Sequence, residues 1–229
     1  MNYSWFILLL GLMTAVYYGR IEYWVTVAII LLTKIIYDMD IFTKTEFKNG
    51  NIQECRLYSK QFLGALSGVE KEIHSFKDLI SKYGLSKRIY KVFALYTNQG
   101  DSPLNSSLKN VSLGIMKYKK SGFGEIEVPS NTIEKEKDLE EYLFNHQYNM
   151  IDIPRTRSIW VNFRLRSDFS LISAMKKFYS KLKEKINKKE LVEVQSNMER
   201  YRTFIILEIY TDDEINFHLP LENLEKFYT

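Results

Sequence analysis

Two apolar stretches occupy the first part of the chain. Residues 5–18 contain no charged side chain, and residues 23–37 contain only Lys34. A helix that crosses a bilayer needs about 20 apolar residues, because the helix rises ~1.5 Å per residue and the hydrocarbon layer is ~30 Å thick. The pattern therefore predicts that residues 1–37 form a membrane anchor, either a transmembrane helix or a transmembrane hairpin.

The two stretches are compatible with several paths of the chain through the membrane. Residues 4–23 can form one span with the second stretch at the interface, or both stretches can form a hairpin that enters and leaves by the same face. A cleaved signal peptide requires a basic N-terminal region, which is missing here, and a pair of buried core helices does not explain why aromatic residues gather at the ends of the stretches. Those aromatic residues are Tyr3, Trp5, Tyr17, Tyr18, Tyr23 and Trp24.

Basic residues set the expected orientation of the anchor. None precedes the first apolar stretch, whereas Arg20, Lys34, Lys44 and Lys48 follow it. Because basic flanking segments stay on the cytosolic side, we expect the lipid bilayer to hold the N-terminal segment and the rest of the chain to face the cytosol.

Residues 52–118 predict the order strand, helix, strand, strand. The expected elements are strands at 52–61, 88–97 and 110–118 and a helix at 68–83. The strands show alternating or continuous apolar runs, and the helix shows apolar residues at helical spacing before Gly84. Asn49-Gly50 is typical of a turn. The helical positions are Val69, Ile73, Phe76, Leu79 and Ile80.

Residues 157–221 repeat that order. The expected elements are strands at 157–166, 201–210 and 214–220 and a helix that begins at Asp168 or Ser170 and ends near Lys188. Residues 119–139 are expected to form a loop, with a short helix after it, inside a linker at 119–156. The chain is therefore predicted to contain one α+β domain at 38–225, made of two β-α-β-β repeats with pseudo-twofold symmetry.

The composition excludes several classes of site but does not indicate a function. The 229 residues are 45% hydrophobic and 26% charged, and the net charge of +4 is too small to indicate a nucleic-acid partner. The single cysteine, Cys55, excludes an internal disulfide and is expected to be a packing residue. The three histidines show no metal-ligand spacing, and no Ser-His-Asp grouping, phosphate loop or CxxC pair is present. We therefore expect neither catalysis nor a cofactor nor a metal.

The closing segment, residues 207–221 (LEIYTDDEINFHLPL), resembles the end of GyrI-like domains, in which a Glu-x-Tyr strand turns into a last strand that ends in Pro. Together with residues 93–98 (FALYTN), residues 151–154 (IDIP) and the apolar N-terminus, it is similar to the testis-expressed ER-phagy receptors of animals. The resemblance implies an interaction protein of the endoplasmic reticulum membrane with a role in reticulophagy. It also implies an autophagy modifier or an AAA-type segregase as partners.

Glu208 leads to an alternative function. The GyrI-like resemblance implies that a glutamate at this place lines a central groove and pairs with cationic ligands. A carboxylate among the aliphatic residues of 206–209 is expected to be desolvated and to attract a cation, with Tyr210 and Trp160 as an aromatic wall. The chain would then be a small-molecule sensor. A Glu208 side chain that points to solvent from an alternating strand is the competing interpretation.

Two further surfaces carry weaker patterns. Tyr148 and Ile151 fit the aromatic-x-x-aliphatic pattern of an autophagy-modifier motif in an expected exposed linker. Lys177, Lys181 and Lys185 lie on a lysine-rich helix that is either a solvated face or a contact with anionic headgroups, at about 1 kcal/mol per residue near the surface.

Overall fold

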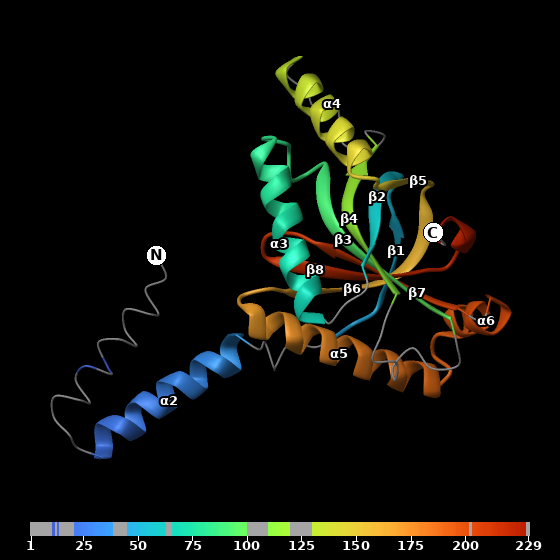
Figure 1. Ribbon diagram of the computed structural model, residues 1–229. Helices are drawn as coiled ribbons and strands as arrows, with labels where there is room; N and C mark the ends of the chain where they lie inside the picture. The colour runs from blue at the N-terminus through green and yellow to red at the C-terminus, as the bar shows by residue number, and fades with distance from the viewer. Residues whose placement is uncertain are drawn as a thin grey trace. The chain divides into compact units, whose positions relative to one another are not determined.

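The computed structural model describes residues 11, 13, 21–38, 45–62, 66–99, 110–119, 130–201 and 203–227. The chain, whose helices and strands are labelled in Figure 1, divides into two compact units. The first contains residues 1–44 and 164–177, and the second contains residues 45–163 and 178–229. Each unit is described by itself below.

The described part of the first unit contains helix α2 (Ile21–Asp38). Within the same unit, the Arg166 guanidinium lies 4.0 Å from the ring centroid of Tyr37 and donates a hydrogen bond of 2.8 Å to the Tyr37 carbonyl oxygen. Among the described residues, no helix combines the length and the apolar character that a bilayer crossing requires. The first predicted stretch, residues 5–18, lies outside the described residues except for Gly11 and Met13.

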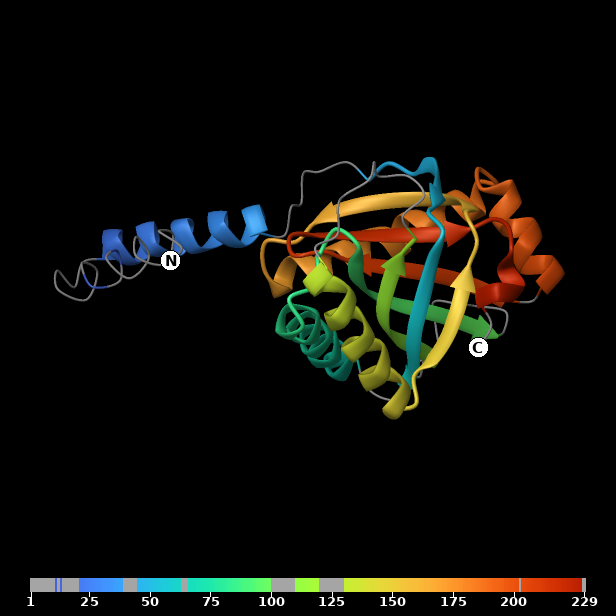
Figure 2. The same ribbon diagram turned by 90° about the horizontal axis from the view of Figure 1, so that it is seen from above.

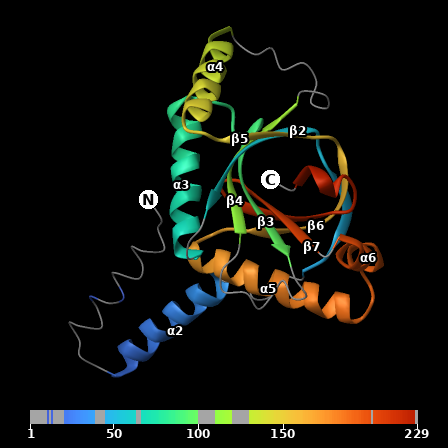
Figure 3. The ribbon, with the colours of Figure 1, turned by 45° about the vertical axis from the view of Figure 1, so that its right-hand side comes forward.

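The second unit is built on one eight-stranded sheet with the order β1-β6-β8-β7-β3-β4-β2-β5. Its strands are β1 (Lys48–Ile52), β2 (Cys55–Phe62), β3 (Tyr90–Gln99), β4 (Asn110–Tyr118), β5 (Asn149–Ile153), β6 (Thr156–Arg164), β7 (Thr203–Tyr210) and β8 (Glu214–Pro220). The helices that accompany them are α3 (Leu66–Lys82), α4 (Ser130–Asn145), α6 (Val192–Tyr201), the 3-10 helix η1 (Leu224–Phe227) and, of α5 (Asp168–Asn187), the part from Phe178 onward. The sheet is strongly curved (Figure 3). The α+β class predicted from the sequence is confirmed.

The sheet has pseudo-twofold symmetry. β3 and β7 pair at its centre, and β4 with β2 on one side matches β8 with β6 on the other. The first half follows the predicted order strand, helix, strand, strand, whereas the second half has the additional helix α6 before β7. Each repeat also sends a short strand to the other: β1 precedes β2 but pairs with β6, whereas β5 precedes β6 but pairs with β2. These two exchanged strands show the same burial pattern along their five residues.

Helix α3 forms where the apolar spacing predicts it. Val69, Ile73, Phe76 and Ile80 are all buried, as expected for residues that share one helical face. The helix ends before Gly84, whose φ of 61° suits a glycine better than any other residue. Near this end, Tyr83 packs against Tyr142, so α3 and α4 lie side by side (Figure 2).

One face of the sheet carries an apolar cluster, the inner cluster, and η1 covers it from inside the curve of the strands (Figure 3). The buried residues of this cluster are Ile52, Cys55, Leu57, Phe93, Leu95, Met116, Ile153, Ile205, Leu207, Ile209, Leu224 and Phe227. Cys55 is 0% exposed, which confirms its packing role, and burial raises the pKa of its thiol to about 12. A thiol in that state is not a nucleophile at neutral pH.

The turn predicted at Asn49-Gly50 is wrong. Both residues lie inside β1, where they pair with Ile159 and Ser158 of β6. A Cβ atom at Gly50 would lie 2.6 Å from Nε1 of Trp160. The glycine therefore serves the close approach of the indole to the backbone rather than a turn.

The linker was also predicted incorrectly. α4 begins at Ser130, so the second half of the loop expected at 119–139 is helical. Leu139 and Leu143, four residues apart and buried, form its inner face. The pair Tyr148 and Ile151 does not lie in an exposed linker, because residues 149–153 form β5 and pair with β2. Helix α6 was not predicted.

Candidate functional site

Glu208 lies on the sheet face opposite the inner cluster. Leu207 and Ile209 belong to that cluster, and neighbouring side chains on a strand point to opposite faces. Phe217 of β8 is paired with Glu208 and therefore shares its face. Its ring stacks on Phe178 of α5 with 4.3 Å between centroids. The C-terminal part of α5, from Phe178 onward, thus covers the face from which Glu208 projects.

The pseudo-twofold axis passes through the pair formed by Ala94 and Glu208. These two residues are directly opposite in the register of β3 and β7. Each is followed by an aliphatic residue and then by a tyrosine and a threonine, as Ala-Leu-Tyr-Thr in β3 and Glu-Ile-Tyr-Thr in β7 and the residue after it. Tyr96 and Tyr210 therefore occupy equivalent positions, two residues from the axis and on the same face as Glu208.

Tyrosines surround the Glu208 carboxylate. Glu208 is 0% exposed, and the Tyr210 hydroxyl donates a hydrogen bond of 2.5 Å to its Oε2 atom. The hydroxyls of Tyr96 and of Tyr179 in α5 are also buried. Burial raises the pKa of each of the three phenols well above its usual value, and the negative charge of Glu208 raises it further. The three hydroxyls therefore stay protonated and can donate hydrogen bonds at neutral pH.

The structure corrects the expectations for this site in part. Glu208 does not point to solvent, so that interpretation is wrong, and Tyr210 lies beside it as expected. Trp160 does not belong to the aromatic wall. It stacks on His218, which is paired with Leu207 and so lies on the opposite face of the sheet. Tyr96 and Tyr179 take the place expected for Trp160.

The remaining candidate residues lie elsewhere. Ile151 is half-buried against the inner cluster, and Tyr148 packs edge-on against Phe76. Lys181 pairs with Glu184, and Lys185 pairs with Glu190, both at 2.6 Å. These lysines thus belong to a surface with its own counter-ions. Lys177 belongs to the first unit.

His218 is a packed residue. It is 9% exposed, and its Nδ1 atom lies 3.1 Å from the Ser158 hydroxyl. Burial lowers its pKa to about 4, so the ring is neutral at physiological pH. Among the described residues, no three His, Cys, Asp or Glu side chains come together as a metal site would require.

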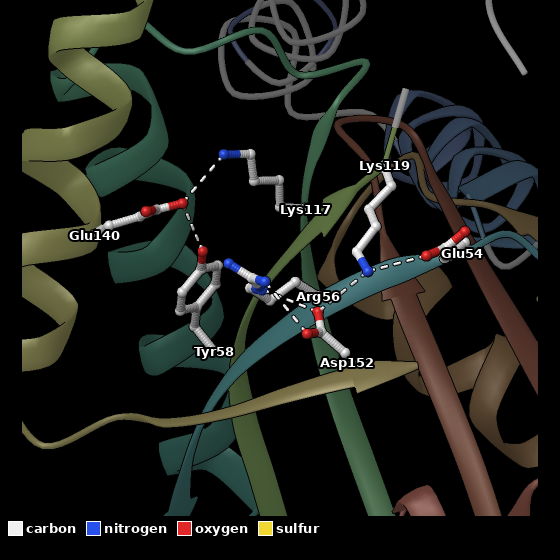
Figure 4. A network of polar contacts seen from close by, with 7 residues as sticks. All are labelled: Glu54, Arg56, Tyr58, Lys117, Lys119, Glu140 and Asp152. Carbon is white, nitrogen blue, oxygen red and sulfur yellow. Dashed lines mark hydrogen bonds and ion pairs between the residues drawn. The ribbon is translucent and has the colours of Figure 1, made fainter. Parts of the chain in front are cut away.

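A second polar group connects α4 to the sheet (Figure 4). The Tyr58 hydroxyl donates to Glu140 at 2.8 Å, and the Lys117 ammonium lies 3.1 Å from Glu140 and 3.2 Å from Glu136. Burial raises the pKa of Glu140, but the hydrogen bonds from Tyr58 and Lys117 outweigh it and hold the pKa below its usual value. The carboxylate is therefore ionised and paired, and it fastens α4 to β2 and β4.

The same group extends along β2 to the exchanged strand β5. Arg56 makes two hydrogen bonds to Asp152, at 2.9 and 3.2 Å, and Lys119 pairs with Glu54 at 2.9 Å (Figure 4). Each carboxylate drawn in Figure 4 has a basic partner. This arrangement is a structural clamp between elements, whereas Glu208 is buried among aromatic side chains.

Comparisons with known proteins give similarities of fold at low sequence identity. No family model and no curated protein matches the chain. Among solved structures, the C-terminal domain of EcmrR is 17% identical, covers 78% of this chain and 98% of its own, and has a TM-score of 0.45. EcmrR in a DNA complex is 15% identical, over 92% of this chain and 75% of that one, with a TM-score of 0.43. SAV2435 bound to tetraphenylphosphonium is 9% identical, over 79% and 96%, with a TM-score of 0.35. These values transfer no residue role to this chain.

Proposed function

We propose that the second unit is a binding domain for a small organic cation, with the Glu208 carboxylate as the counter-ion. The observation that carries this proposal is the complete burial of Glu208 among Tyr96, Tyr179 and Tyr210. This is the small-molecule alternative predicted from the sequence.

The chemistry of the site favours an organic cation over other ligands. An ionised carboxylate in an apolar interior is costly unless a positive charge or hydrogen bonds compensate for it. A ligand cation supplies that charge, and the faces of the tyrosine rings attract it further, by about 0.5–2 kcal/mol per ring. A cation with apolar substituents also gains by leaving water.

The site has to open before a ligand can enter. Glu208 is 0% exposed, Tyr96 is 4% exposed and Tyr210 is 3% exposed. Because these rings cover the carboxylate, a cation reaches it only when at least one of them changes rotamer. We therefore expect ligand binding to be accompanied by a change in tyrosine fluorescence or in aromatic NMR shifts.

The test is a calorimetric titration with tetraphenylphosphonium and, separately, with tetrabutylammonium. The Glu208→Gln variant keeps the size of the side chain and removes the charge, so we expect its affinity to fall at least tenfold, or about 1.4 kcal/mol. Glu225→Gln removes an exposed carboxylate from η1 and serves as the matched control, with unchanged affinity expected. Equal affinities for the wild type and Glu208→Gln, or no binding of either cation, would contradict the proposal.

The other functional expectations stay predictions. These are the anchor in the endoplasmic reticulum membrane, the role in reticulophagy with its modifier or segregase partner, the contact of the lysine-rich helix with headgroups, and the lack of enzymatic activity and of a nucleic-acid partner. Delivery of the endoplasmic reticulum to the degradative compartment, measured with and without the gene, tests the main prediction among them.

A further inference from the structure

A cavity of about 220 Å³ lies in the second unit, between α3 and the sheet. Val92 and Tyr210 line it from the sheet, where they pair in the register of β3 and β7. Ile80 of α3 and Tyr90 complete an apolar wall, and all four side chains are buried. Ligand pockets for drug-sized molecules are usually about 300–1,000 Å³, so this cavity suits a smaller molecule with an apolar body.

Lys77 brings an amino group to this wall. It is half-buried, and it lies on the side of α3 that packs on the sheet, since Ile73 and Ile80, four residues before it and three after it, are buried. Its Nζ atom donates a hydrogen bond of 2.8 Å to the Thr211 carbonyl oxygen, and Thr211 also lines the cavity. The amino group is therefore held in a defined position beside the apolar wall.

Burial makes the Lys77 amine less basic than an ordinary lysine. The loss of solvation lowers its pKa, the charge of Asp212 opposes that change, and the charge of Lys87 adds to it. At a given pH, a larger fraction of Lys77 is therefore neutral than of an exposed lysine. The neutral amine keeps an N–H for the Thr211 carbonyl oxygen and leaves its lone pair available for an electrophile.

We propose that this cavity captures small apolar aldehydes, with Lys77 as the nucleophile that forms an imine with them. The nitrogen lone pair attacks the carbonyl carbon, and a proton passes from nitrogen to oxygen to give a carbinolamine. The hydroxyl group then leaves with the second N–H proton as water, and the C=N bond forms. One water is released for each imine, so the step needs no oxidant or reductant. Lysine amines form such Schiff bases with carbonyl compounds.

Lys91 is a control that separates the effect of the cavity from that of burial. It is also half-buried, and burial lowers its pKa too, which the carboxylates at the turn between β7 and β8 oppose. Lys91 pairs with Met116 of the inner cluster and precedes Val92 of the cavity wall. Because neighbouring side chains on a strand point to opposite faces, the Lys91 side chain projects away from the apolar wall.

The experiment is reductive labelling of the full chain at pH 7 with benzaldehyde and sodium cyanoborohydride, followed by peptide mass spectrometry. Cyanoborohydride converts each imine to a stable secondary amine. We expect Lys77 to be labelled at least fivefold faster than Lys91 and than Lys82, an exposed lysine at the end of α3. With glycolaldehyde, which has a polar body, the preference for Lys77 over Lys91 should fall below twofold.

A cavity-filling variant provides a second measurement. Ile80→Phe enlarges a side chain of the apolar wall, so we expect it to slow the benzaldehyde labelling of Lys77 at least threefold and to leave Lys82 unchanged. A thermal melt checks that this variant is folded, and the comparison of the two aldehydes on the wild type needs no variant.

Two results would overturn this proposal. Labelling of Lys77 by benzaldehyde no faster than that of Lys91 would leave burial alone as the cause of any reactivity. An equal preference for Lys77 with benzaldehyde and with glycolaldehyde would show that the apolar wall makes no contribution.

This proposal goes beyond the cation site and fails separately from it, because imine formation does not use Glu208. Glu208→Gln should leave the labelling rate of Lys77 within twofold. Lys77→Arg keeps a positive charge and a donor for Thr211, and it should leave tetraphenylphosphonium affinity within twofold. A loss of Lys77 labelling in Glu208→Gln would contradict an independent site, whatever the outcome for the cation.

Discussion

The two repeats have the same framework but place different side chains at the axis that relates them. At the pseudo-twofold axis, the first repeat has Ala94 and the second has Glu208. In α3, Lys77 follows the buried Phe76, and in α5, Tyr179 follows the buried Phe178. The second repeat thus places a buried carboxylate at the axis, where the first repeat has a methyl group.

The largest expected effect comes from making the axis symmetric in charge. Ala94→Glu places a second buried carboxylate opposite Glu208, and two like charges without room for solvent destabilise the fold. We expect a loss of about 3 kcal/mol or more in the free energy of unfolding at pH 7, measured with urea.

The matched control for that substitution is Ala94→Gln, which adds nearly the same volume without a charge. We expect Ala94→Gln to be clearly more stable than Ala94→Glu at pH 7, with a smaller difference at low pH, where carboxyl groups are protonated. Equal stability of the two variants would show that the cost is one of volume alone.

The next two predictions concern Gly114 of β4 and His218 of β8, which occupy equivalent positions in the two repeats. Gly114 follows Leu113, and His218 follows Phe217. A Cβ atom at Gly114 would lie 1.8 Å from the Tyr58 carbonyl oxygen, so Gly114→Ala requires the backbone of β2 or β4 to shift. We expect a loss of about 2–4 kcal/mol in a urea titration. A loss below the ~0.5 kcal/mol typical of surface substitutions would contradict this close approach.

His218 makes stability depend on pH. Its pKa is about 4 in the folded chain, below the ordinary value of 6.5, so the unfolded chain binds the additional proton. Its contribution is therefore present above pH 6.5 and is lost progressively as the pH falls toward 4, by roughly 3 kcal/mol in total. His218→Gln should remove this part of the acid destabilisation. Parallel pH profiles for the wild type and the variant would contradict it.

The smallest effect concerns the exchanged strands. Arg56 pairs with Asp152 of β5, and the equivalent Arg157 pairs with Glu193 and Glu222. All three ion pairs are solvent-exposed and screened. We expect Arg56→Gln to cost about 0.5 kcal/mol and Arg157→Gln to leave the urea midpoint unchanged within error. A large loss in Arg157→Gln would show that exposed ion pairs contribute substantially to the stability of this fold.

The sequence predicted the elements that carry strong periodicity. The bounds of β4, β8 and α3 agree with the expected ones within two residues, because the spacing of their apolar residues fits only one type of secondary structure. It did not predict the exchanged strands, since Asn49-Gly50 in β1 resembles a turn and both five-residue segments are fixed only by pairing with the other repeat. Helix α4 was partly missed because its many charges hid Leu139 and Leu143.

The sequence allowed part of the candidate site to be predicted. Glu208 and Tyr210 lie two residues apart on one strand, so they necessarily share a face. The face of Trp160 depends on the register between strands, which the sequence alone does not fix. Tyr96 was recoverable, because Ala-Leu-Tyr-Thr at 94–97 repeats the pattern of Glu-Ile-Tyr-Thr at 208–211. Tyr179 carried no signal other than its place after Phe178, which matches Lys77 after Phe76.

The most direct test of the central claim is the affinity of tetraphenylphosphonium for the wild type and for Glu208→Gln, measured by calorimetry on the full chain. A buried carboxylate that serves as the counter-ion predicts binding to the wild type and at least tenfold weaker binding to the variant. Binding of equal strength to both proteins would show that Glu208 is a structural residue.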